Sequence, residues 1–78
     1  MRVRVKQKFT DFDGQVIPAG KVLTYRHGSY FPYDGGHTWE FDGCTIRLAE
    51  IANQEDIIEN RDGAWFETLD DSARLLHR

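Results

Sequence analysis

The sequence predicts a mostly β fold: a small, partly open barrel of about five short antiparallel strands with one short helix near residues 54–60. The main signal is an Asp-Gly pair that occurs four times, starting at Asp13, Asp34, Asp42 and Asp62. Such pairs favour tight hairpin turns, because glycine accepts positive φ angles and aspartate tolerates the left-handed region. Four turns in 78 residues leave room only for short strands.

The length of 78 residues admits one domain. We expect residues 1–69 to form it, with residues 70–78 as a C-terminal tail that is either frayed or a short helix. Cys44 is the single cysteine, which excludes an intramolecular disulfide. No apolar stretch reaches the length of a signal peptide or a membrane span, so we expect a cytoplasmic protein without membrane association.

Alternating side chains predict the first strand. Val3, Val5 and Phe9 fall on one face, which is expected to join the core. The opposite face is uniformly basic, with Arg2, Arg4, Lys6 and Lys8. Edge strands often carry Lys and Arg to deter pairing with another sheet, and this strand fits that ordinary explanation. Self-pairing of two copies through the strand is left open, as is the oligomeric state.

A hairpin around Asp42-Gly43 is the best-determined element. With a two-residue loop there, Phe41 lies opposite Cys44 and Trp39 opposite Ile46. The apolar side chains of both strands then share one face, made of Trp39, Phe41, Cys44, Ile46 and Leu48. A slip of one residue would invert every side chain, so the pattern itself supports the pairing.

The remaining elements follow from turn and capping signals. Pro18 and Gly20 predict a turn at residues 17–20 that leads into a strand at about 21–26. This Pro-Ala-Gly stretch before an apolar strand is similar to those of SH3-like barrels, which makes the predicted fold an SH3-like, partly open barrel. Asn53 is an N-cap candidate for the helix, and acids follow in its first turn. Residues 64–69 are expected to form a closing strand.

Several of these turn and core residues together resemble a known pattern. They are Phe9, Asp11, Asp13, Gly14, Gly20, Phe31, Pro32, Tyr33, Asp34, Gly36, Ile46, Arg47, Leu48, Trp65 and Phe66. In this order they resemble the Phe-x-Asp-x-Asp-Gly segment, the Phe-x-Pro-Tyr-Asp-like stretch and the Ile-Arg-Leu strand of a small bacterial family of unknown function, over roughly residues 5–68; here Phe31 directly precedes Pro32. The resemblance implies a single domain and transfers no catalytic role.

The sequence evidence for a catalytic site or a metal site is weak. Asp11 could begin a calcium loop, but no acidic residue follows at the last ligand position. His27, His37 and Cys44 are zinc ligands by type, yet their spacing matches no paired-ligand pattern. Ser29 near His27 has no evident third member of a catalytic triad. We therefore expect no enzyme, no cofactor and no metal.

The functional hypothesis depends on the uneven charge distribution and on a group of aromatic residues. Residues 1–28 hold six basic and two acidic side chains, whereas residues 29–78 hold four basic and eleven acidic ones. The aromatic candidates for a contact surface are Tyr25, Tyr30, Phe31, Tyr33 and Trp39. Most of these rings could instead fill the core, and the acids could be ordinary solvated surface. We expect Tyr30, Tyr33, Glu55, Asp56 and Glu59 to bind another protein.

The leading hypothesis is therefore a non-enzymatic protein–protein interaction module, an inhibitor, an immunity protein or an accessory protein of a bacterium or phage. The alternative is an oligonucleotide-binding barrel that uses the basic face of Arg2, Arg4, Lys6 and Lys8. The net charge of −3 weighs against that alternative, because nucleic-acid binders are usually basic.

Overall fold

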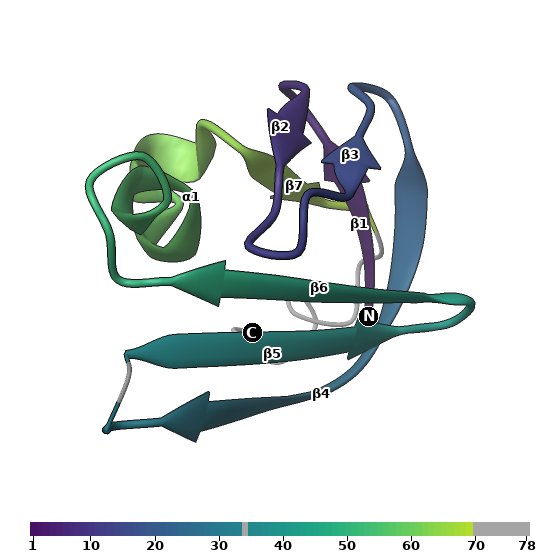
Figure 1. Cartoon of the computed structure of the whole chain (residues 1–78). Coiled ribbons are helices and arrows are strands. Elements are labelled where there is room, and N and C mark those ends of the chain that lie inside the picture. Colours follow the sequence, from purple (N-terminus) through teal and green to yellow (C-terminus); the bar gives the residue numbers. More distant parts are fainter. Residues whose placement is uncertain (34, 70–78) are drawn as a thin grey trace, which may run out of the picture.

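The computed structural model describes residues 1–33 and 35–69. Their elements are β1 (Arg2–Val5), β2 (Phe9–Thr10), β3 (Val16–Ile17), β4 (Val22–Phe31), β5 (Gly36–Phe41), β6 (Cys44–Ala49), α1 (Glu55–Glu59), a 3₁₀ turn (Arg61–Gly63) and β7 (Phe66–Thr68). Five strands form one antiparallel sheet in the order β6-β5-β4-β1-β7, and β2 pairs with β3 (Figure 1). The mostly β fold with one short helix is confirmed.

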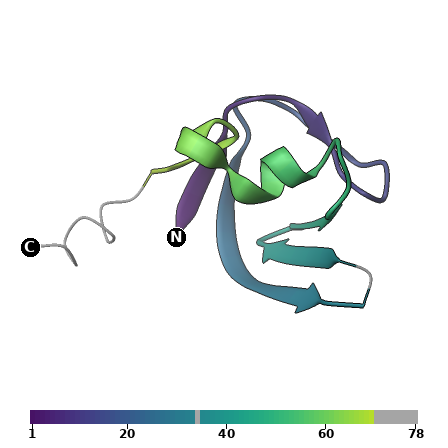
Figure 2. The ribbon, with the colours of Figure 1, turned by 90° about the vertical axis from the view of Figure 1, so that its left-hand side faces the viewer.

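β4 gives the sheet its curvature. Its first residues pair with β1, where Leu23 lies opposite Val3. Its later residues pair with β5, where Tyr30 lies opposite His37, and a β-bulge separates the two regions between Tyr25 and His27. Such a bulge bends a strand and increases its twist. β4 therefore continues as one long curved ribbon from β1 to the layer of β5 and β6 (Figure 2), and the described strands do not close into a barrel.

The alternation expected for the hairpin and the first strand defines the core. β5 and β6 pair in the predicted register around Asp42-Gly43. The core cluster consists of the buried side chains of Val3, Val5, Phe9, Ile17, Leu23, Phe41, Ile46, Leu48, Ile57 and Phe66. Trp39 and Cys44 are half-buried against this cluster. Phe66 makes edge-on contacts with Phe9 and Trp39, each with 5.7 Å between ring centroids, and so links the two ends of the core.

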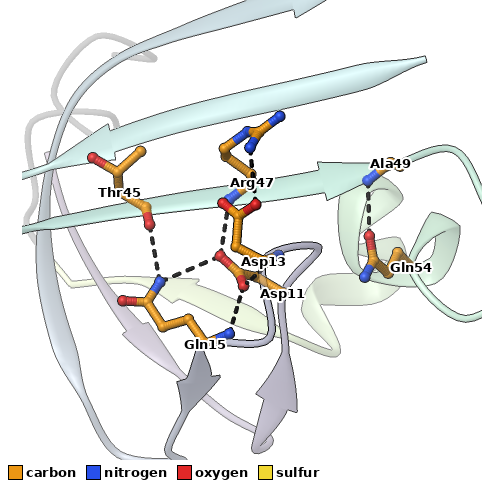
Figure 3. A network of polar contacts seen from close by, with 7 residues as sticks. All are labelled: Asp11, Asp13, Gln15, Thr45, Arg47, Ala49 and Gln54. Carbon is orange, nitrogen blue, oxygen red and sulfur yellow. Dashed lines mark hydrogen bonds and ion pairs between the residues drawn. The ribbon is translucent and has the colours of Figure 1, made fainter. Parts of the chain in front are cut away.

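The buried carboxylate of Asp11 fastens the turn between β2 and β3 to β6 (Figure 3). It accepts hydrogen bonds from the backbone N–H groups of Asp13 at 3.0 Å, Gln15 at 2.8 Å and Arg47 at 3.2 Å. The side-chain amide of Gln15 donates a fourth bond to it at 3.3 Å. With its oxygens facing these donors, Asp11 closes a turn, and the segment is not arranged as a calcium loop.

Polar side chains, together with the backbone of Phe12, cover both outer edges of the sheet. At β6, Gln15 Nε2 donates to the carbonyl of Thr45 at 2.9 Å, and the N–H of Phe12 donates to the carbonyl of Arg47 at 2.7 Å. At β7, the Asn60 side chain accepts from the N–H of Phe66 at 2.9 Å and donates to its carbonyl at 3.2 Å. At each of the two edges, these hydrogen bonds use backbone groups that a further strand would need for pairing.

Three sequence-based expectations about single elements are wrong. β1 lies between β4 and β7, so it is not an edge strand. β4 and β7 pair with its two sides, which are the sides through which two copies of the chain would have paired. The helix does not use Asn53 as its N-cap: it begins after Gln54, whose Oε1 accepts from the N–H of Ala49 at 2.8 Å. Phe9 belongs to the separate strand β2 rather than to the first strand.

The limits of other elements also differ from expectation. β4 runs on to Phe31 because β5 supplies partners beyond the predicted end of that strand. The closing strand is limited to Phe66–Thr68, since Asn60 binds the N–H of Trp65 and of Phe66 at its start. The predicted tail at residues 70–78 lies outside the described residues.

Replacement of Asp11 tests the role of its carboxylate. Asp11→Ala leaves three backbone N–H groups without their acceptor, and we expect the free energy of unfolding to fall by about 2–4 kcal/mol. Urea denaturation followed by tryptophan fluorescence measures it. Asp13→Ala is the matched control, because it removes only a half-exposed ion pair with Arg47 and should cost less than about 1 kcal/mol. Equal losses in both variants would contradict the assignment.

Candidate functional site

A hollow of about 390 Å³ lies where the ends of β4 and β5 face α1. We call it the acidic groove; it is lined by Tyr30, His37, Glu50, Glu55, Ile58 and Glu59. Tyr30 and His37 are paired across β4 and β5, which places both side chains on the same face of the sheet. Glu55, Ile58 and Glu59 have the helical spacing that puts them on one face of α1. The groove therefore has a wall of sheet and a wall of helix.

Aromatic rings form the sheet wall of the acidic groove. The Tyr30 and His37 rings lie with their centroids 4.6 Å apart, and Tyr30 keeps 49% of its surface exposed. His37 Nε2 is buried and makes no hydrogen bond within the described residues. Glu50 Oε1 lies 3.6 Å from it, beyond hydrogen-bond distance. The wall thus offers a half-exposed ring face and a buried nitrogen without a hydrogen-bond partner.

Glu50 is held in place by the turn between β4 and β5. Its N–H donates to the carbonyl of Gly35 at 3.0 Å. Gly35 has a φ of +64°, and a Cβ there would lie 3.2 Å from the Cβ of Glu50. Glycine is therefore favoured at this position both by the backbone conformation and by the close approach of Glu50.

The carboxylates give the groove its charge. Glu50 and Glu55 form no ion pair with Lys or Arg among the described residues, whereas Glu59 Oε2 contacts Arg61 at 3.0 Å. Arg61 is largely exposed, so it neutralises Glu59 only weakly. The groove is therefore a local concentration of negative charge that can attract a cation.

A second hollow of about 390 Å³ continues on the other side of Ile58, which lines both. We call it the apolar groove; it is lined by Met1, Val3, Tyr25, Trp39, Phe41, Ile58, Asn60, Phe66 and Thr68. Gly28 in β4 leaves space for two of these rings. A Cβ at Gly28 would lie 2.7 Å from Tyr25 Oη and 3.3 Å from Trp39 Cδ1.

The structure brings three of the five predicted partner-binding residues together. Tyr30, Glu55 and Glu59 line the acidic groove. Asp56 is exposed on α1 but does not line it, and Tyr33 is fully exposed and lines none of the described hollows.

Sequence reasoning missed His37, Glu50 and Ile58 as groove residues. A four-residue loop at residues 32–35 would have paired Tyr30 with His37. No local signal indicates where α1 places Ile58 or where Glu50 lies relative to the helix.

The basic residues of the alternative hypothesis are partly engaged within the chain. Arg4 Nη1 contacts Glu67 Oε1 at 2.6 Å across β1 and β7. Lys6 Nζ donates to the carbonyl of Gly63 at 2.7 Å. Arg2 and Lys8 are exposed. The stripe is thus less available to phosphates than the sequence suggests.

The residues considered for catalysis and metal binding are not arranged as a catalytic or metal site among the described residues. His27 Nε2 contacts Glu40 Oε2 at 2.6 Å on the exposed face. Across residues 1–33 and 35–69, no group of three His, Cys, Asp or Glu side chains could hold a metal ion. No helix in those ranges is long and apolar enough to cross a membrane.

The fold is similar to that of the integron cassette protein VCH_CASS4 from the mobile metagenome of Vibrio cholerae. The TM-score is 0.79 at 23% sequence identity, over 87% of this chain and 83% of that chain. No protein-family model matches the chain, and no curated protein matches it. This likeness shows the fold alone. It supports a structural relation to a bacterial protein, while membership of the small family stays a prediction.

Gly28→Ala tests the packing beside the grooves. The added methyl group requires the Tyr25 and Trp39 rings to move, and we expect a loss of about 1–3 kcal/mol in the free energy of unfolding. Urea denaturation measures the loss, and tryptophan emission should shift with the displaced ring. Ser29→Ala, at the next exposed position, should stay within about 0.5 kcal/mol of the parent. If Gly28→Ala were as stable as Ser29→Ala, the packing argument would fail.

Proposed function

We propose that this domain is a non-enzymatic interaction module that receives a Lys or Arg side chain of a partner protein in the acidic groove. The observation that carries the proposal is the meeting of Glu50 and Glu55, neither paired with Lys or Arg among the described residues, with the exposed face of Tyr30. Carboxylates and aromatic faces both attract cationic side chains in proteins.

The chemistry of the groove favours arginine. A guanidinium group is planar, can stack on the Tyr30 ring and can donate paired hydrogen bonds to a carboxylate. The side chains that line the groove include no Ser, Thr, Cys or Lys nucleophile. Binding of a basic partner surface through steered association is how an inhibitor or immunity protein would use such a groove.

Oligonucleotide binding has less support. Two of the four basic side chains that it requires, Arg4 and Lys6, bind groups of their own chain. Binding of single-stranded DNA at low salt that falls when Lys8 is replaced would restore support for the alternative.

Substitutions on α1 test the proposal against a matched control. The probe is a fluorescein-labelled decapeptide library with arginine fixed at the centre, compared with a library in which neutral citrulline takes its place. We expect only the arginine library to bind, more weakly as salt rises. Glu55→Gln should weaken binding about tenfold, because a charge-assisted hydrogen bond contributes about 1.5 kcal/mol or more.

Asp56→Asn is the control, since Asp56 occupies the same first turn of α1 but does not line the groove. It should change the affinity less than about twofold. Fluorescence anisotropy measures both variants. Equal binding of the two libraries, or equal losses from the two substitutions, would count against the proposed function.

A further inference from the structure

We infer that protonation of His37 regulates the acidic groove. The neutral imidazole leaves the Glu50 carboxylate available to the cation of the partner, whereas the protonated imidazole binds that carboxylate itself. This inference rests on the proposed function, because it specifies the condition under which the same groove accepts its ligand. Histidine is the side chain whose ordinary change of charge falls between about pH 5 and about pH 8.

One ring nitrogen of His37 is buried without a hydrogen-bond partner. Nε2 is shielded from solvent and makes no hydrogen bond within the described residues. Glu50 Oε1 lies 3.6 Å from it, just beyond hydrogen-bond distance. A neutral imidazole has a donor at only one of its nitrogens, whereas an imidazolium donates from both. Protonation therefore makes a charge-assisted hydrogen bond between Nε2 and the carboxylate available.

The Glu50 side chain can close this gap while its backbone stays in place. The N–H of Glu50 donates to the carbonyl of Gly35 at 3.0 Å, which fixes the point from which the side chain extends. The Glu50 side chain keeps 46% of its surface exposed, and that of His37 keeps 22%. A displacement of about 0.8 Å would bring Oε1 to the roughly 2.8 Å that is usual for a bond between a cationic N–H and a carboxylate.

Other charged and titratable side chains also surround His37. They come from β4, from α1 and from the residues in and after β6, and they are Tyr30, Glu55, Glu59, Arg47 and Glu50. Arg47 borders His37 only through a smaller hollow of about 60 Å³, and its guanidinium contacts Asp13 Oδ1 at 2.8 Å. In the described part of the chain, Glu50 is the acid within 4 Å of a His37 ring nitrogen. It is therefore the carboxylate that a protonated His37 would bind.

Protonation would change the groove in two ways. It adds a positive charge where the cation of the partner would lie, and like charges repel. It also occupies Glu50, one of the two groove carboxylates that have no Lys or Arg partner among the described residues. Binding of the partner and binding of the proton then compete, and each lowers the affinity for the other by the same factor. The partner is held at neutral pH and released as the pH falls.

The pH dependence of binding tests this competition. The probe is an arginine-centred decapeptide library that contains no His, Asp or Glu and carries a tetramethylrhodamine label. Fluorescence anisotropy measures its affinity at about pH 8 and about pH 5.5. The parent should bind about fivefold or more weakly at the lower pH, because carboxyl groups titrate about two pH units below imidazole and stay mostly charged. In His37→Gln the two affinities should differ less than about twofold.

His27→Gln is the matched control, since His27 contacts Glu40 on the exposed face and lines neither groove. It should keep the pH dependence of the parent, as should His77→Gln, which removes the third histidine of the chain. If the parent binds the library equally well at both pH values, the inference fails while the proposed function stands. Absence of binding at both pH values would overturn the proposed function and the inference together.

An NMR titration of the His37 ring in the parent chain supplies the second readout. An excess of the unlabelled library should move the midpoint of this titration to lower pH, because the bound cation opposes the imidazolium. Glu50→Gln should move it in the same direction, because the carboxylate that binds the imidazolium is gone. The midpoint of His27 should not move in either case. A His37 midpoint that stays unchanged with the library, or in Glu50→Gln, would overturn the inference.

Discussion

A mismatch in strand length shapes this molecule: β4 has ten residues, whereas its neighbour β1 has four. β1 can therefore cover only the first part of β4. The bulge between Tyr25 and His27 then turns the rest of β4 away from β1, and that part carries β5 and β6 across the core. The two grooves beside β4 follow from this single mismatch.

Polar side chains complete the sheet at its two outer strands, β6 and β7. Asp11 substitutes for a strand partner of β6, Asn60 does the same for β7, and Gln54 joins α1 to the end of β6 through the N–H of Ala49. Each bond satisfies a backbone group that would otherwise lose its partner on burial. A domain of this size has few buried apolar side chains, so these polar attachments fix the positions of α1 and the β2–β3 turn.

Short sequence patterns predicted the structural features that depend on residues close together in the chain. The register around Asp42-Gly43 followed from a two-residue loop and alternating side chains, both encoded within twelve residues. The central position of β1 depends on β7, more than sixty residues later, and no periodicity reveals that pairing. For the groove, Tyr30, Glu55 and Glu59 were found as an aromatic and an acidic signal. Glu50 was not, because its position follows from the Gly35 carbonyl across the β4–β5 turn.

The charge distribution separates a basic strand from an acidic groove. The basic face of β1 is partly neutralised by Glu67, whereas Glu50 and Glu55 line the acidic groove without Lys or Arg partners in the described ranges. In the proposed function, these carboxylates would attract a cationic side chain of a partner protein and repel the same carboxylates of a second copy. Protection from self-association and selection of a partner would then depend on one group of side chains.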